Sequence, residues 1–250
     1  METDGDEVQA ASEMSTWLNA TGQVESTIPA SLADALDLTA GDEVTVTPVV
    51  ADGELAFRVA LGNASGTHVV KVKRRVEPHT QTTLRIPAPL AAVSGLTGHV
   101  RERNVSLAYE RRADGFEVRP WPPLRPWAPV GRDPLDLDAA DREIVPMPEQ
   151  YMLTVPVEYA RALHLEGGQP VAWHLAVRDG ALAIVVDLDI ERGDDGCIRR
   201  VQHHHAGGSG RKIDQYHLYP PKGVIDALGW LKTPLTITGG EGYLQLRRRD

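Results

Sequence analysis

The sequence predicts a mainly β fold with short helices, built from four related units in one chain. The first observation is the string "IPASLADALDLTAGDEVTV", which begins at Ile28. It joins a strand-ending proline to a short amphipathic helix, a Gly-Asp turn and a new strand. The second is that related strings recur three times along the chain, and the third is a hairpin turn after each copy. Four ordered copies indicate an internal repeat.

Each copy is anchored on a proline, and the anchors are Pro29, Pro87, Pro156 and Pro221. The residue nine positions after each anchor is large and apolar, and these residues are Leu38, Leu96, Leu165 and Trp230. A leucine also stands seven positions after three of the anchors, whereas the second copy has Ser94 there. This spacing places apolar side chains on or near one face of a short helix. Gly41 and Gly168 are expected to stop two of these helices.

Two strands are predicted on each side of every short helix. The strand pairs that follow the helices cover residues 42–59, 99–118, 169–186 and 234–246. Asp52-Gly53, Asp114-Gly115 and Asp179-Gly180 are their predicted turns, with Gly242 in the last copy. The candidate strands that precede the helices cover residues 15–28, 67–86, 143–155 and 197–219. One such unit is too small to fold alone, so two units are expected to interleave around a shared core.

Composition narrows the functional class. The chain has 250 residues, 42% hydrophobic and 24% charged, as in soluble globular proteins. The acidic N-terminus is unlike a secretory leader, no apolar run has membrane-spanning length, and the single cysteine fits a reducing cytoplasm, where we expect the protein to reside. Nucleotide-binding, hydrolase and metalloprotease signatures are absent, and "GGSGRK" from Gly207 lacks Walker spacing. The sequence therefore predicts a protein that is not an enzyme and has no cofactor.

The unit resembles the AbrB/SpoVT/MazE swapped-hairpin family, whose string is a Val/Ile-Pro step, a helix of the type Pro-x-x-Leu-x-x-Ala-Leu-x-Leu, a Gly-Asp turn and a strand pair with Asp-Gly. The string at Ile28 is similar to it nearly position by position, and those at Val155, Ile86 and Pro220 are progressively less similar. The resemblance covers most of residues 15–249. It implies that two units interlock their hairpins into one barrel, so this chain would hold two pseudo-dimeric barrels. It also implies double-stranded DNA as the partner and transcription regulation as the role.

The resulting domain prediction has four parts. They are an acidic disordered tail at 1–14, a first barrel of units one and two at 15–119, a proline-rich linker at 120–138 and a second barrel of units three and four at 139–250. The linker contains "RPWPPLRPWAPVGRDP", whose proline density favours extended backbone. Trp121 and Trp127, with Leu124 between them, either form a docking site for a protein partner or fold back on the neighbouring barrel.

Charge alternates in sign with the predicted repeat. Net charges are −11 for residues 1–66, +6 for 67–125, −9 for 126–195 and +5 for 196–250, within a total of −9. The basic excess of units two and four falls on the strands and loops that bind DNA in the family. The candidate phosphate contacts are Lys71, Lys73, Arg74, Arg75, Arg85, Arg199, Arg200, Arg211 and Lys212. The alternatives are that basic units pair electrostatically with acidic ones, within the chain or between chains, or that these charges are solvated surface.

The sequence also departs from the family. Many members carry an arginine four residues before the proline, whereas this chain has Glu25, Thr83, Met152 and His217 there. This departure and the overall acidity favour a second hypothesis, a non-enzymatic adaptor that uses the same scaffold without DNA and docks a partner through Trp121 and Trp127. The two hypotheses differ in their expected salt dependence.

The run His203–His205 is the one cluster with metal-ligand chemistry. Because alternate residues of a strand face opposite ways, at most two of these rings can share an ion, and no metal site is predicted. Cys197 has the basic neighbours Arg199 and Arg200, yet nothing near it indicates an oxyanion site, so it is not predicted to act as a nucleophile.

Overall fold

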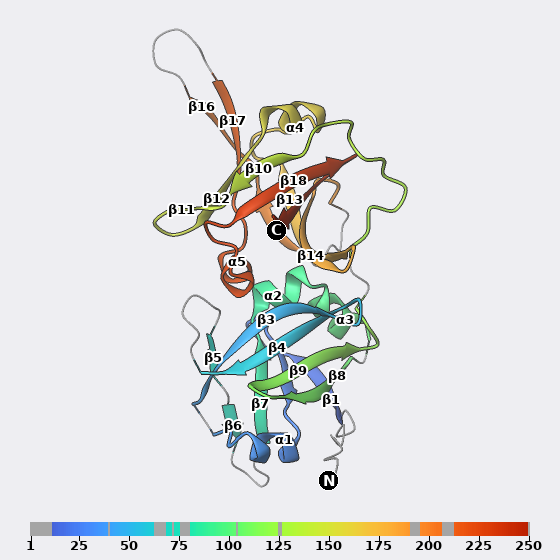
Figure 1. The fold of residues 1–250 in the computed structure, drawn as a ribbon, viewed down its shortest axis with the longest axis vertical. Helices are drawn as coiled ribbons and strands as arrows, with labels where there is room; N and C mark the ends of the chain where they lie inside the picture. Colours follow the sequence, from blue (N-terminus) through green and yellow to red (C-terminus); the bar gives the residue numbers. More distant parts are fainter. Residues whose placement is uncertain are drawn as a thin grey trace, which may run out of the picture.

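The computed structural model describes residues 12–39, 41–62, 69–71, 73–75, 81–103, 105–124, 127–190, 196–206 and 213–249. The protein is mainly β with a few short helices, and its largest sheet is curled (Figure 1). No helix in these ranges is both long enough and apolar enough to cross a bilayer. The predicted fold class is confirmed at this level. Most of the predicted acidic tail lies outside the described residues, and the first strand already begins at Ser12.

One antiparallel sheet of nine strands takes all its strands from residues 12–121. Its order is β5-β3-β4-β9-β8-β1-β2-β7-β6, so β5 and β6 are the edges. The strands are β1 (Ser12–Leu18), β2 (Val24–Thr27), β3 (Glu43–Ala51), β4 (Glu54–Leu61), β5 (Val69–Lys71), β6 (Lys73–Arg75), β7 (Gln81–Ile86), β8 (Ser106–Arg112) and β9 (Gly115–Trp121). We call this part the first half.

The second half contains two sheets. Six strands are ordered β10-β18-β19-β14-β13-β15, and four are ordered β11-β12-β17-β16. The strands are β10 (Ala140–Glu143), β11 (Val145–Pro146), β12 (Tyr151–Val155), β13 (Pro170–Arg178), β14 (Ala181–Asp187), β15 (Cys197–Arg200), β16 (Gln202–Ala206), β17 (Ile213–Leu218), β18 (Pro234–Gly240) and β19 (Tyr243–Arg248). Between β9 and β10, the described residues of 122–139 form no helix or strand.

The short helices begin directly after the four anchoring prolines, as predicted. They are α1 (Ala30–Ala35), α2 (Ala88–Val93), α4 (Val157–Ala162) and α5 (Lys222–Leu228). The residue eight positions after each anchor adopts a left-handed conformation, at Asp37 (φ 50°), Gly95 (76°), His164 (49°) and Gly229 (65°). The prediction that Gly41 and Gly168 stop the helices is therefore wrong. These glycines also have positive φ, but they lie in the turn that follows.

The left-handed conformation eight residues after each proline can be tested at Gly229. Gly229→Ala is expected to destabilise the protein by about 1 kcal/mol, because an L side chain is strained at positive φ. The measurement is the free energy of unfolding by denaturant. Gly223→Ala, inside α5, is the matched control and is expected not to lose stability, because alanine is the better helix former there. An unchanged stability of Gly229→Ala would contradict a left-handed helix stop.

Strand pairing follows the same scheme in both halves. The strand before each proline pairs with its counterpart in the neighbouring unit, as β2 does with β7 and β12 with β17. The last strands of the units also pair, as β4 does with β9 and β14 with β19. The first strand of each unit crosses to the hairpin of the other unit, in the pairs β1·β8, β3·β5, β10·β18 and β13·β15. Each half therefore consists of two interleaved units. Units one and two pair their strands in the first half, and units three and four pair theirs in the second.

Two local predictions in unit two are wrong. Residues 99–102 were expected to begin a strand, but they belong to helix α3 (Leu96–Glu102), which starts after left-handed Gly95 and buries Leu96, Thr97 and Gly98. The predicted Asp114-Gly115 turn is displaced by one residue, because Arg112 pairs with Gly115. A side chain at residue 115 would meet the carbonyl oxygen of Val59 at 2.0 Å, so glycine is required there by the neighbouring strand.

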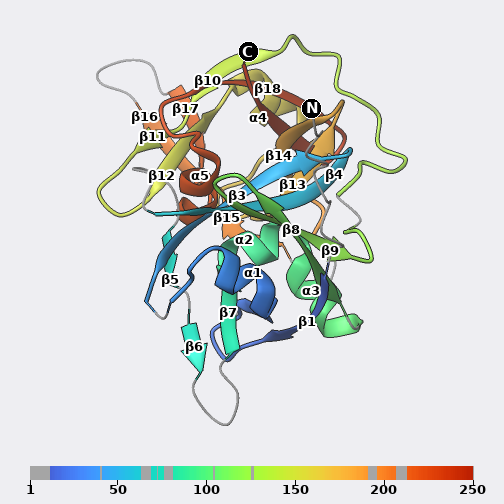
Figure 2. The ribbon, with the colours of Figure 1, turned by 60° about the horizontal axis from the view of Figure 1, so that its bottom comes forward.

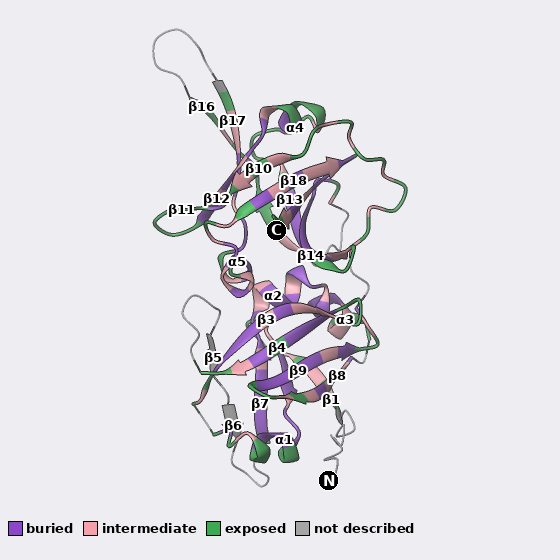
Figure 3. Ribbon diagram, viewed as in Figure 1, coloured by how far each residue is buried: buried purple, intermediate pink, exposed green. Residues whose placement is uncertain are grey.

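The two halves meet through α2 and α5. Helix α2 packs against α5, β13 and β15, and α5 also packs against β3 (Figures 1 and 2). One continuous core of buried aliphatic and aromatic residues extends through both halves, with Phe57 and Phe116 in the first and Trp173 in the second (Figure 3). The helices of units two and four thus form the junction, while α1 and α4 lie toward opposite ends of the molecule (Figure 1).

Candidate nucleic-acid interface

Two segments rich in cations occupy equivalent places in the two halves. They are segment 70–75, with the sequence VKVKRR, and segment 199–204, with the sequence RRVQHH. On one side, Lys71 pairs with the residue fourteen positions after Pro29, and Arg200 pairs with the residue fourteen positions after Pro156. On the other side, Lys73 and Gln202 each pair with the residue four positions before the next anchor. The two segments therefore superpose in register without a gap, which the sequence alone did not reveal.

Unit three has the same geometry with different chemistry. Val145 pairs with Met152, four residues before Pro156, so residues 143–147 (EIVPM) stand where 71–75 and 200–204 stand. Ile144 and Val201 are buried at the same step, 1% and 0% exposed, and each separates a strand of the six-stranded sheet from one of the four-stranded sheet. The shared apolar residue anchors the backbone, and the flanking residues set the charge. Unit three keeps one cation, Arg142, at the step of Arg199, but it has Glu143 at the step that Lys71 and Arg200 occupy.

Both segments lie on sheet edges. Strands β5 and β6 are the edges of the nine-stranded sheet, while β15 and β16 end the six- and four-stranded sheets. Arg199, Arg200, Gln202 and His204 are exposed. In Figures 1 and 2, β5 and β6 of the first half and β16 of the second lie on the same, left-hand side of the molecule. An extended ligand that touches both segments would therefore run along the long axis.

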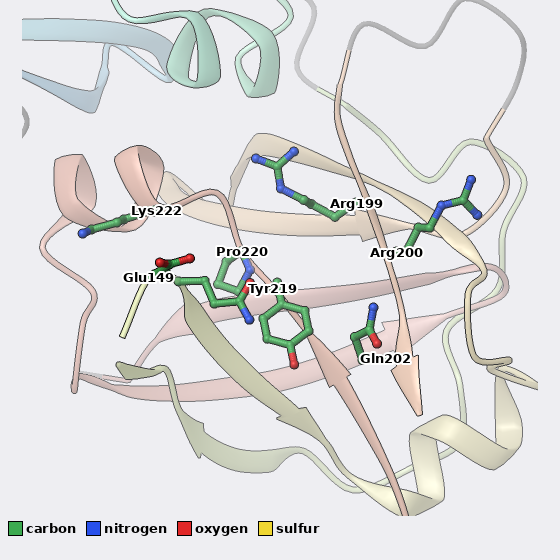
Figure 4. Close-up of a pocket in the computed structure, with 8 residues that line it drawn as sticks. Glu149, Arg199, Arg200, Gln202, Tyr219, Pro220 and Lys222 are labelled. Carbon is green, nitrogen blue, oxygen red and sulfur yellow. The ribbon is translucent and has the colours of Figure 1, made fainter. Parts of the chain in front are cut away.

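The second segment borders a pocket of about 390 Å³. Its cations are Arg199, Arg200 and Lys222, and none of the three forms an ion pair with a carboxylate in the described ranges. The pocket is also lined by Glu149, Gln150, Gln202, Tyr219 and Pro220 (Figure 4). Lys222 and Tyr219 were not predicted as site residues, because their proximity to β15 depends on the fold and has no sequence signal.

The cations of this pocket diverge. Arg199 and Arg200 leave the strand in opposite directions, as successive residues of a strand must (Figure 4). An Nη atom of Arg200 donates a 2.7 Å hydrogen bond to the carbonyl oxygen of Gly168, and the Lys222 ammonium lies 5.7 Å from the centre of the Tyr151 ring. These contacts leave the positive charges unneutralised. Divergent charges suit a ligand that passes along the edge better than one small enclosed anion.

Arg85 behaves differently from the other candidates. Its Nε donates a 2.8 Å hydrogen bond to the carboxylate of Glu25, which stands directly opposite on β2, and both side chains are largely buried. Arg119 likewise pairs with Asp52 of unit one, while buried Glu117 pairs with Arg112 and Arg119 within unit two. Charge matching between units therefore accounts for Arg85 and Arg119, which are part of the basic excess of unit two.

The linker tryptophans have separate environments. Trp127 folds back on the second half: its Nε1 donates a 2.8 Å hydrogen bond to buried Asp187, and its ring centre lies 5.3 Å from that of Tyr243. Arg132 pairs with the same carboxylate at 2.7 Å. Leu124 is buried, whereas Trp121 is 56% exposed. Of the predicted docking pair, Trp121 alone presents its indole to solvent.

The surroundings of the described histidines and of Cys197 differ from those of a metal site or a reactive thiolate. In the described residues, no three His, Cys, Asp or Glu side chains gather as metal ligands. Burial raises the pKa of the Cys197 thiol, and the charge of Arg199 offsets only part of that shift, so the reactive thiolate is disfavoured. His203 stacks on Tyr216 with ring centres 4.5 Å apart, and its Nε2 lies 3.2 Å from Asp214 Oδ1.

Part of the predicted interface lies outside the described residues. Arg211 and Lys212 belong to that part, and so do the side chains of Lys71, Lys73, Arg74 and Arg75, whose backbone forms β5 and β6. Strand register thus places four first-half cations and two second-half cations, Arg199 and Arg200, at equivalent edges. No family model, curated protein or solved structure matches the chain.

Proposed function

We propose that the chain is a DNA-binding transcription regulator that contacts the phosphate backbone of duplex DNA through segments 70–75 and 199–204. The observation that supports this best is the common register of the two segments. Lys71 and Arg200, which are far apart in sequence, stand at the same strand step in the two halves, whereas unit three has Glu143 at that step. A structural role in the core would not require this selective placement of charge on edges.

We further propose that each half is a swapped-hairpin barrel of the AbrB/SpoVT/MazE type. The crossing of each unit's first strand to the hairpin of the other unit supports it, as does the proline-anchored helix between the strands. In such a barrel the paired strands before the prolines carry the nucleic-acid contacts. Segments 70–75 and 199–204 flank these strands.

The chemistry of the segments suits phosphate recognition. Lysine and arginine neutralise phosphates and release condensed counterions, which gives affinity without sequence preference. The net charge of −9 disfavours polyanions over the rest of the surface, so contact is confined to these edges. Because β5 and β6 of the first half and β16 of the second lie on one side of the molecule, a duplex along the long axis could meet both segments, and the two contacts would reinforce each other (Figures 1 and 2).

The test is the salt dependence of binding by the full chain. A labelled random-sequence duplex of about 30 base pairs is titrated between about 50 and about 300 mM salt, and log Kobs is plotted against log salt concentration. Four or more phosphate contacts predict a slope of about −4 or steeper. Absence of binding at about 50 mM salt, or a slope flatter than about −1, would rule out the proposal.

The exposed indole of Trp121 favours a second function, an adaptor that binds a protein partner. An aromatic side chain that is 56% exposed beside the linker is the type of residue that anchors interfaces. Trp121→Ala would abolish such an interaction and leave DNA binding unchanged. Loss of DNA binding in Trp121→Ala would instead place this indole in the nucleic-acid interface.

A further inference from the structure

The second-half segment differs from the first in one chemical respect. Register places His203 where the first half has Arg74 and His204 where it has Arg75. Arginine is always charged, whereas histidine gains or loses its charge between about pH 5 and 8. The second edge therefore combines the permanent cations Arg199 and Arg200 with histidines at the two steps where the first edge has arginines.

The two histidines are not alike. Side chains alternate along a strand, so His203 shares a face with Tyr216 and Asp214, and His204 shares the opposite face with Gln202, Gln215 and His217. The charge of a protonated His203 would be balanced by Asp214, 3.2 Å away. His204 is exposed and has no ion pair with a carboxylate in the described ranges. Of the two, His204 is placed to offer a net positive charge to a ligand.

His204 has a second histidine, the buried His217, as its neighbour on the same strand face. Its ring centre lies 5.3 Å from that of His217, which is buried and whose Nδ1 is 3.1 Å from Thr154 Oγ1. Burial, and then the neighbouring charge of His204, lower the pKa of His217. His217 thus stays neutral to lower pH than an ordinary histidine.

Other charged groups stand nearby. The remaining ones on the packed elements are Arg200 on β15, Asp214 and Tyr216 on β17, Glu158 and Arg161 on α4, and Glu149, Tyr219 and Lys222 around the pocket. Arg200 and Lys222 line the pocket together with Glu149 and Gln202, and Gln202 shares a face of β16 with His204. A proton on His204 would add a positive charge on the strand face that borders this pocket.

We propose that His204 is a proton-dependent phosphate contact, so that the second half binds duplex DNA more tightly in mildly acidic solution. This inference rests on the proposed DNA-binding function. Protonation adds one cation to the edge at the position that Arg75 occupies permanently in the first half. Segment 199–204 then approaches the charge pattern of segment 70–75.

The experiment measures binding of the full chain to the same random duplex at about pH 5.5 and about pH 8, across a salt series. One added contact is expected to steepen the slope of log Kobs against log salt by about 0.9 at the lower pH, which is roughly an eightfold gain in affinity at about 0.1 M salt. His204→Gln removes both changes. His204→Arg shows the steeper slope at both pH values.

His203→Gln is the matched control, and it keeps the pH dependence because the charge of His203 faces Asp214. A slope that is independent of pH in the natural chain overturns this inference and leaves the DNA-binding function standing. If His204→Gln keeps the full pH dependence, another group takes up the proton. That result also overturns this inference and leaves the DNA-binding function standing. Absence of DNA binding at both pH values overturns the inference and the proposed function together.

Discussion

Removing the six cations of segments 70–75 and 199–204 is expected to weaken binding to duplex DNA at least about a thousandfold at about 0.1 M salt. The variant has glutamine in place of Lys71, Lys73, Arg74, Arg75, Arg199 and Arg200. Each phosphate contact contributes about 0.9 to the slope of log Kobs against log salt, so the slope is expected to flatten by several units at once. Partial variants in one segment are expected to lose part of the slope, in proportion to the cations removed.

The control keeps the change in charge but moves it off the proposed interface. Arg111 on β8 and Arg248 on β19 are exposed arginines outside both segments. The double variant Arg111→Gln with Arg248→Gln is compared with Arg199→Gln with Arg200→Gln, which removes the same charge. Equal losses of affinity in the two double variants would show that only net charge matters, and the edge segments would then have no special role.

The largest expected effect on stability is at Phe57. Phe57→Ala is expected to lower the free energy of unfolding by about 3–5 kcal/mol, because it removes a fully buried ring and leaves a cavity. Phe57 pairs with Val118, where the last strands of units one and two meet, so the cavity would open between the two units. Such a loss is a large part of the stability of an ordinary domain.

Denaturant unfolding of the full chain measures this effect. Leu61→Ala on the same strand is the control, since Leu61 is 42% exposed and its truncation should change stability by no more than about 0.5 kcal/mol. A loss below about 1 kcal/mol for Phe57→Ala would contradict a core shared between the two units of the first half.

The repeated architecture was largely predictable because its signals are local. Proline ends each strand and begins each helix whatever the tertiary context, so all four helix starts were predicted correctly. The residues at which the helices stop were not predicted correctly. Glycine is the usual residue in the left-handed conformation that ends a helix, and this preference indicated Gly41 and Gly168. The chain instead places Asp37 and His164 in the left-handed conformation, and the residues that follow them, Leu38 and Leu165, are buried. Helix α3 was missed for a similar reason, since its stabilising burial is tertiary.

The interface was only partly predictable. The cation clusters are visible as composition, but their equivalence is hidden because the connection after Arg75 is five residues shorter than the one after His204. Only strand register aligns the two segments. The pairing of Arg85 with Glu25 needed the β2–β7 register, and the return of Trp127 to Asp187 needed the path of the linker. These are contacts between distant residues, for which a single sequence has no local signal.

Hydrogen–deuterium exchange of the full chain, with and without a duplex of about 30 base pairs at low salt, tests the central claim most directly. We predict slower exchange at residues 69–75 and 197–206 in the complex, and unchanged exchange at residues 141–147 of unit three, which are equivalent to 69–75. Protection confined to unit three or to the surface around Trp121, with both cationic edges unaffected, would contradict the account.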